Sequence, residues 1–111
     1  MRAGRLTLER LTEVAASAPA RFFGVEQVKG RIAAGLDADL VVLDEDETWT
    51  VRAADLHNMN RYSPFEGHSL TGRVRATYVR GEPVYVRAAD GSETFGATGY
   101  GRRVRRETLV S

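Results

Sequence analysis

The two histidines are the residues of this chain whose chemistry best suits a metal ion. His57 lies in the polar run D-L-H-N-M-N, and His68 follows after an interval of ten residues. Zinc sites usually combine three or four ligands at short spacings, and the chain has no cysteine to add to the two histidines. One interpretation is a metal site completed by nearby acids. The ligand count favours the other, in which each ring has a surface or hydrogen-bonding role.

Carboxylates precede an apolar run at residues 40–43. Asp37 and Asp39 could act as an acid and a base, but no nucleophile, further base or oxyanion donor is identifiable beside them. Aspartates before a strand more commonly accept backbone N–H bonds in a turn, and Asp44 at the end of the run fits the same role. Ser63 lacks Gly-x-Ser-x-Gly surroundings, so it is interpreted as a turn residue and not as a nucleophile. The sequence therefore predicts no catalytic, cofactor-binding or metal-binding residue.

Glycine and arginine dominate the last part of the chain, residues 88–111. Its glycines lack the Gly-Lys-Ser/Thr sequence and the strand-to-helix setting of a phosphate loop. Tyr100 is followed by four arginines, Arg102, Arg103, Arg105 and Arg106. Such a set could stack on and neutralise single-stranded nucleic acid, but a net charge of +1 for the whole chain predicts no general attraction to it. With so few large apolar side chains, the segment is expected to be a flexible arm.

Helical spacing marks the first part of the chain. Thr7 can cap a helix of roughly 10–12 residues. Pro19 then opens a second short helical turn, which Gly24 can close in the left-handed conformation. The adjacent Phe22 and Phe23 are predicted to anchor a core.

Strand patterns follow from residue 25 onward. The candidate strands are residues 25–32 (interrupted by Gly30), 40–43, 48–52, 73–79 and 84–86. The continuous apolar run 40–43 is expected to be covered on both faces. Residues 80–83 predict a hairpin turn, and the return strand is expected to start after Pro83 or to lie at an edge, because proline cannot donate to a ladder.

A length of 111 residues fits one small domain. The predicted class is mainly β (α+β): half of a small β-sandwich, one N-terminal helix and a flexible C-terminal arm. The expected division is a helical lead-in at 1–24, a small β-domain at 25–87 and the tail at 88–111. No run approaches the roughly 20 apolar residues that cross a bilayer, and the N-terminus lacks a secretory apolar segment, so a cytoplasmic location without a membrane partner is expected.

Three motifs in a fixed order carry a family resemblance. They are G-R-I-A-A-G-L-D-A-D-L-V-V-L-D at 30–44, S-P-F-E-G at 63–67 and G-R-V-R-A-T-Y-V-R-G-E-P-V-Y at 72–85. Together with the helix before them, they make residues 7–86 similar to the C-terminal quarter of the cyclic amidohydrolases. The run N-R-Y-S-P-F-E-G is most similar to allantoinases, which would imply purine catabolism; dihydroorotases come next, then dihydropyrimidinases or hydantoinases.

The resemblance implies a catalytic (β/α)₈ barrel beside a small β-sandwich. In that barrel a His-x-His pair, a carboxylated lysine, two further histidines and an aspartate hold two divalent metals, such as zinc, that activate water for hydrolysis of a cyclic amide. Here the histidines form no His-x-His pair and the single lysine, Lys29, lies in a predicted turn. None of the family's metal ligands can be placed on this sequence, so the barrel and the cofactor are expected to be absent from this chain.

The resemblance further implies that N-terminal strands of the family complete the sandwich. Without them the chain is expected to expose sheet edges, and Phe65 to be an exposed contact point. The function expected is a structural one: an inactive C-terminal β-domain fragment of an allantoinase-like hydrolase. The alternative is a stand-alone β-rich interaction module, or a subunit that completes a barrel-bearing partner. Both expect self-association or a partner strand at an exposed edge.

Overall fold

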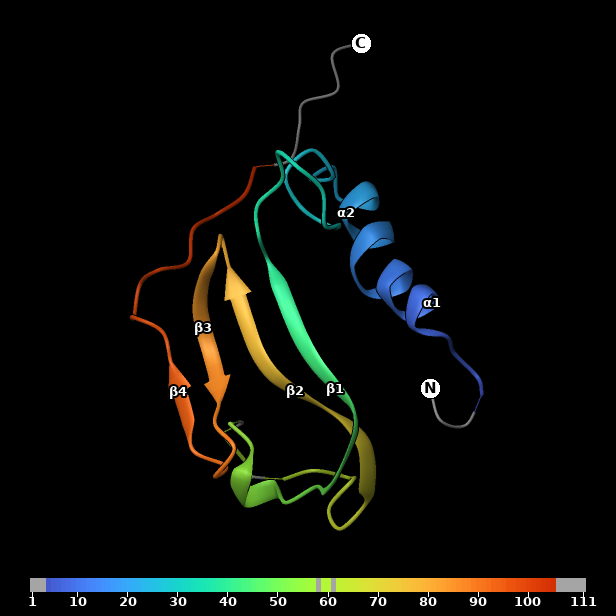
Figure 1. The fold of residues 1–111 in the computed structure, drawn as a ribbon, viewed down its shortest axis with the longest axis vertical. Coiled ribbons are helices and arrows are strands. Elements are labelled where there is room, and N and C mark those ends of the chain that lie inside the picture. Colours follow the sequence, from blue (N-terminus) through green and yellow to red (C-terminus); the bar gives the residue numbers. More distant parts are fainter. Residues whose placement is uncertain (1–3, 58, 61, 106–111) are drawn as a thin grey trace.

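A single antiparallel sheet is the centre of the structure (Figure 1). The computed structural model describes residues 4–57, 59–60 and 62–105. The four strands, in the spatial order β1-β2-β3-β4, are β1 (Leu40–Thr50), β2 (Ser69–Val79), β3 (Glu82–Arg87) and β4 (Glu93–Phe95). One helical segment precedes them, and the described residues form no barrel. The predicted class, mainly β with one N-terminal helix, is confirmed.

The helical segment is continuous from Leu8 to Phe22. It consists of α1 (Leu8–Thr12), the π-helical turn η1 (Glu13–Ser17) and α2 (Ala18–Phe22). Thr7 caps it as predicted, because its Oγ1 accepts the backbone N–H of Arg10 at 3.1 Å. The helix does not break before Pro19, contrary to expectation. A wider π turn ahead of the proline relieves the contact that its ring would otherwise make with the preceding carbonyls.

Residues 24–39 connect the helix to the sheet without a strand. Gly24, with φ of 73°, ends α2 in the predicted left-handed conformation. The strand predicted at residues 25–32 is wrong: this stretch forms turns. Gly30 explains the difference, because its φ of 103° is incompatible with a strand and its backbone lies against the helix, where Ser17 Oγ donates to Gly30 O at 3.0 Å.

β1 and β2 form the longest ladder, from the pair Leu40–Tyr78 to the pair Thr50–Ser69. The two segments predicted at 40–43 and 48–52 belong largely to one strand. Between them, three residues of β1 face the single residue Gly72 of β2, whose φ of 100° permits the bend. A second irregularity lies nearer the top of the ladder, where β2 has one more residue than β1 between the pairs Val42–Ala76 and Leu43–Val74.

Arg80 and Gly81 form the hairpin turn between β2 and β3, both with positive φ (47° and 80°). β3 begins at Glu82 and lies between β2 and β4, so the expectation that it starts after Pro83 or lies at an edge is wrong on both counts; Pro83 pairs with Tyr78 inside the ladder. β4 was not predicted. It lies within residues 88–111, the segment expected to be a flexible arm, and pairs with β3 from Tyr85–Phe95 to Arg87–Glu93.

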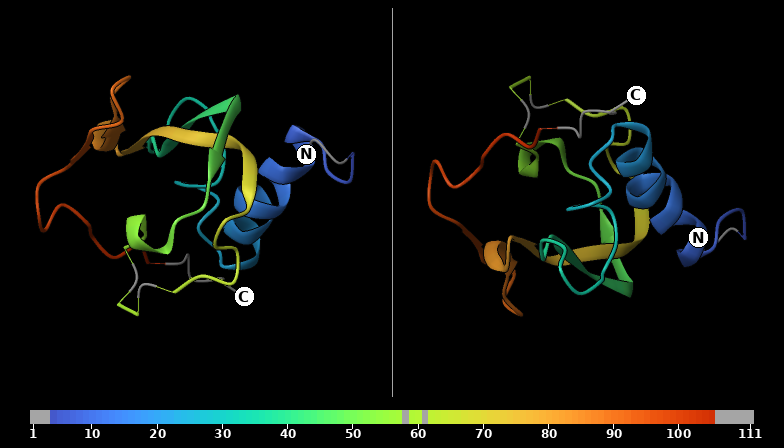
Figure 2. Two further views of the ribbon diagram at one scale, coloured as in Figure 1. Left: turned by 90° about the horizontal axis from the view of Figure 1, so that it is seen from below. Right: turned by 90° about the horizontal axis from the view of Figure 1, so that it is seen from above.

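The core of the described residues is very small. Its buried apolar side chains are those of Ala20, Val51 and Ala76. Phe22 and Phe23, predicted to be core anchors, are 83% and 63% exposed, because the helix lies beside the sheet and not on it (Figure 2). The run 40–43 is also not covered on both faces, since Val41 and Val42 are exposed.

The shape is correspondingly open. The accessible surface is 9005 Å², whereas a folded monomer of this mass exposes about 6,000 Å². The radius of gyration is 16.4 Å, against about 13 Å for a compact domain of this length. Within the described part of the chain, no helix is long and apolar enough to cross a membrane.

Candidate functional site

The two histidines lie against different aromatic rings. His57 packs edge-on against Phe95 of β4, with ring centroids 5.4 Å apart, and His68 packs against Phe65 at 5.9 Å. Among the described residues, no group of three or more histidine, cysteine, aspartate or glutamate side chains could hold a metal ion. These residues therefore do not fit the two-metal centre that the resemblance implies, and no metal-dependent step is derived for this chain.

Asp37 and Asp39 form a cluster with Lys29 that closes the loop before β1. Lys29 Nζ lies 3.0 Å from Asp37 Oδ2 and also contacts Asp39 Oδ2. Asp39 Oδ1 accepts the backbone N–H of Arg80 at 2.9 Å, and Gly81 N–H donates to Ala38 O at 3.0 Å. Asp39 accepts a backbone N–H as predicted, but its donor lies 41 residues away and not in the local turn, so its carboxylate joins the loop to the β2–β3 hairpin.

The electrostatics of this cluster favour the charged forms. Burial acts to lower the pKa of Lys29, but hydrogen bonds and charges from Asp39 and Asp37 outweigh it and raise the pKa above its ordinary value. Burial likewise acts to raise the pKa of Asp39. Hydrogen bonds from Lys29 and the Arg80 backbone outweigh that effect and lower the pKa of Asp39 below its ordinary value. The lowered pKa makes the Asp39 carboxylate a weaker base than a free aspartate, and the raised pKa makes the Lys29 ammonium a weaker acid than a free lysine, so both groups suit a structural tie better than proton transfer.

Tyr100 ties the tail to the same hairpin. The Arg80 guanidinium lies 4.3 Å from the centroid of the Tyr100 ring and also donates to the Tyr100 carbonyl. The aromatic residue considered for nucleic-acid stacking is thus half-buried against Arg80. Arg102, Arg103 and Arg105 are exposed, and Arg106 lies outside the described residues.

The S-P-F-E-G loop is a turn, as predicted. Ser63 Oγ accepts the Phe65 N–H at 3.1 Å. Val51, at the end of β1, exchanges backbone hydrogen bonds with His68 and Gly67 at 2.9 Å each, which closes the loop over the bottom of the sheet. Phe65 is 56% exposed, as expected, and its role as a contact point stays a prediction.

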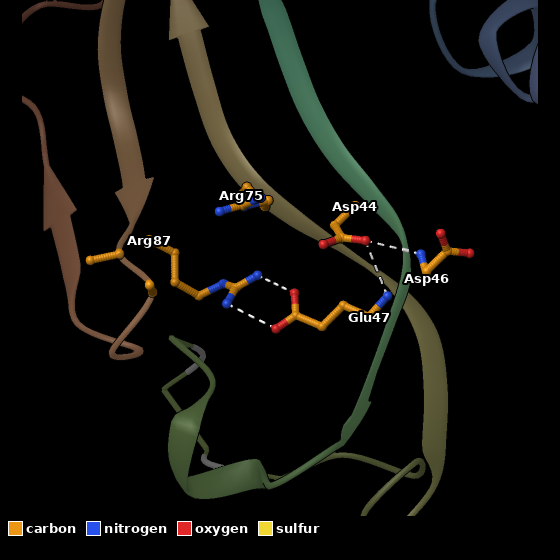
Figure 3. A pocket seen from close by; sticks show the side chains of 7 residues that line it. Asp44, Asp46, Glu47, Arg75 and Arg87 are labelled. Carbon is orange, nitrogen blue, oxygen red and sulfur yellow. Dashed lines mark hydrogen bonds and ion pairs between the residues drawn. The ribbon is translucent and has the colours of Figure 1, made fainter.

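Charged side chains also line a pocket of about 420 Å³ where β1 bends (Figure 3). They are Asp44, Asp46, Glu47, Arg75 and Arg87. Asp44 Oδ1 accepts the N–H groups of Asp46 at 3.0 Å and Glu47 at 3.2 Å, which confirms its predicted turn role. Arg87, from β3, forms a two-bond ion pair with Glu47, one bond being Nη1 to Oε1 at 3.0 Å. No local pattern predicts this pair, because its partners are 40 residues apart.

A sequence model of the amidohydrolase family matches residues 1–85, well over half of the chain. The chain belongs to the amidohydrolase family. The amidohydrolase resemblance inferred from the three motifs is therefore shown, and those motifs lie on β1 and the loop before it, on the loop below the sheet and on the β2–β3 hairpin.

Named relatives of this amidohydrolase chain are hydantoinases. It is 42% identical over 103 residues to an L-hydantoinase of Paenarthrobacter aurescens and 38% identical over 107 residues to a D-phenylhydantoinase of Escherichia coli. The matches cover 93% and 96% of this chain but 22% of each relative. A solved D-hydantoinase (dihydropyrimidinase) from a Thermus species superposes with a TM-score of 0.84 at 40% identity, again over 96% of this chain and 22% of that one.

These relatives change the order of the resemblances. Allantoinases were placed first and hydantoinases last from the motifs, whereas the matches support a cyclic amidohydrolase related to hydantoinases. The motifs alone ranked the subfamilies wrongly, because they lie on turns and strands whose residues the fold itself constrains.

Proposed function

We propose that this chain is a β-domain portion, from the C-terminal part, of a hydantoinase-type amidohydrolase, and that its own role is structural. One observation carries the proposal: nearly the whole chain matches hydantoinases, yet it spans only 22% of their length. The reaction of the complete enzyme would be hydrolysis of a cyclic amide C–N bond by metal-activated water. An allantoinase-type activity in purine catabolism is the alternative substrate assignment.

The exposed surface of the chain supports a buttressing role. Phe22, Phe23 and Ile32 project from the helix and the loop after it, with 83%, 63% and 88% of their surface exposed. Large apolar side chains exposed to this degree are typical of surfaces that other polypeptide covers, and the rings of Phe22 and Phe23 pack against each other. We infer that further amidohydrolase polypeptide covers this face and that the metal ligands belong to it.

A simple assay tests the structural role. The purified chain is incubated with hydantoin and with dihydrouracil, with and without added zinc, and ring opening is followed by loss of ultraviolet absorbance. The expected result is no turnover and no zinc retained after gel filtration. Turnover that is lost when His57 or His68 is replaced by alanine would overturn the proposal.

The second candidate is an interaction module that completes a partner through the edge of the sheet. β1 favours it, because this strand pairs with β2 on one side only and spans eleven residues. A long unpaired edge is a template for another strand. Light scattering on the purified chain separates the cases: a stable dimer indicates that a second copy occupies the edge, and a monomer leaves the edge for a different polypeptide.

A further inference from the structure

The pocket at the bend of β1 has an unused donor in its wall. The Arg87 side chain is only 9% exposed, and its Nη1 and Nη2 groups both bind Glu47. Its Nε–H is buried and has no hydrogen-bond partner within the described part of the chain. A buried guanidinium donor without an acceptor is costly, so the position favours a group that supplies one.

A second arginine faces the same space. Ala76 pairs with Val86, so the next position along the antiparallel ladder brings Arg75 opposite Arg87. Like charges directly opposite each other on a sheet are destabilising. Glu47 neutralises Arg87, but within the described residues no carboxylate forms an ion pair with Arg75, which is the extra β2 residue at the irregularity of the β1–β2 ladder and lines the pocket. Figure 3 shows its nitrogen end directed toward the side of the pocket where Arg87 lies.

We propose that this pocket binds a carboxylate. One carboxylate oxygen accepts the Arg87 Nε–H and the other accepts from the Arg75 guanidinium, a geometry suited to the planar, two-oxygen group. The acids of the pocket select the charge of the ligand. Asp44, Asp46 and the Arg87-bound Glu47 also line it, so a dianion such as sulfate is repelled more strongly than a monocarboxylate.

The carboxylate has two possible sources with the same chemistry. It is a free small molecule, or an aspartate or glutamate side chain of further amidohydrolase polypeptide that covers the pocket. The proposal does not depend on the hydantoinase assignment, because every residue that forms the pocket belongs to this chain.

The test is a titration of the ¹⁵N-labelled chain with sodium acetate, followed through the Arg87 Nε–H signal at constant ionic strength. The backbone N–H signals of Asp46 and Glu47, which are bonded to Asp44, report that the bend is folded. We expect a saturable shift with a dissociation constant on the order of millimolar. Arg75→Gln should weaken it about tenfold, the loss typical of one charged hydrogen bond. Arg52→Gln, which removes an exposed arginine outside the pocket, should leave it unchanged.

Three results would overturn the proposal: a shift that stays linear in acetate, equal binding by Arg75→Gln, or tighter binding of sulfate than of acetate. To identify the source of the carboxylate, the labelled chain is mixed with an L-hydantoinase from which the region matched by this chain has been removed. If the Arg87 Nε–H signal moves on complex formation and acetate no longer shifts it, a side chain fills the pocket. If acetate still binds in the complex, the ligand is a free carboxylate.

Discussion

β1, β2 and β3 hold one another through ladders of backbone hydrogen bonds, whereas the helical segment from Leu8 to Phe22 is bonded to the loop that follows it. In the described structure, no helix residue has its Cα within 8 Å of a strand residue. The sheet adds side-chain ties to its ladders, including the Arg87–Glu47 pair and the Trp49 Nε1–H bond to Gly72 O at 2.9 Å.

This difference shows which region meets its own bonding and packing needs and which region does not. The sheet satisfies its interior backbone groups by itself, and only its outer edges lie open. The helix satisfies its backbone but leaves its apolar side chains in water, so its stability in a larger protein would come from whatever covers them. The predictions below separate the two regions, starting with the largest effect.

Gly30→Ala should release the helix and leave the sheet intact. A Cβ at this position would lie 2.4 Å from Ala20 Cβ, and the φ of 103° adds backbone strain. Together we expect a cost of about 3 kcal/mol in the helix–loop contact. Hydrogen exchange should then lose protection in residues 8–22 while β2 amides keep theirs. The matched control is Gly35→Ala, also at positive φ (88°) but with open space around it; a similar loss in both variants would contradict the contact with Ala20.

Glu47→Ala should destabilise the sheet and leave the helix unchanged. Arg87 would then be a nearly buried cation without its carboxylate, which costs about 2 kcal/mol after allowance for the partial exposure of Glu47. The measurement is the urea midpoint of the Trp49 fluorescence change, since Trp49 lies in β1. Glu45→Ala, an exposed acid two residues away, is the control and should leave the midpoint where it is. Equal midpoints for the two variants would show that the pair contributes nothing.

The loop that joins the regions should depend on pH at both extremes. The pKa of Asp39 is lowered in the fold, so its contribution is full above the ordinary value near 3.8 and is lost as the pH falls below it. The pKa of Lys29 is raised, so its contribution is full below 10.5 and is lost as the pH rises above it. For partly exposed ion pairs we expect about 0.5–1 kcal/mol at each end. In the Asp39→Asn variant, the melting temperature should fall less steeply as the pH is lowered. An unchanged pH dependence would mean that other carboxyl groups cause the loss of stability in acid.

Phe22→Ser should have the smallest effect on the chain alone. The ring is 83% exposed, so we expect a change in stability within about 0.5 kcal/mol. Its effect should appear as weaker self-association, measured by light scattering at rising concentration. Leu40→Ser, at a partly buried position of β1, is the contrasting variant and should destabilise the sheet. A large loss of stability in Phe22→Ser would mean that the helix is packed in solution.

Local patterns predicted the parts of the fold that local forces decide. The cap at Thr7, the left-handed Gly24 and the hairpin at Arg80 and Gly81 depend on residues within a few positions of each other. The polar tie at Asp39 was also anticipated as a turn role, although its partner Arg80 was not.

The features that the sequence could not predict depend on which residues the strands bring opposite each other. Arg75 and Arg87 meet because the ladders of β2 bring them together, and β4 forms because the residues after Arg87 turn back along β3. The exposure of Phe22 and Phe23 could not be predicted either. An apolar stripe indicates a face that packs, but it does not indicate which polypeptide that face packs against.

The most direct measurement adds this chain to the L-hydantoinase of Paenarthrobacter aurescens from which the matched region has been removed. We predict a one-to-one complex by light scattering, recovery of hydantoin hydrolysis, and new hydrogen-exchange protection at Phe22, Phe23 and the outer edge of β1. The Phe22→Ser chain should recover less activity than the unaltered one. Hydrolysis by the chain alone, or a complex whose protection falls only on β4 and the tail, would contradict the structural role proposed here.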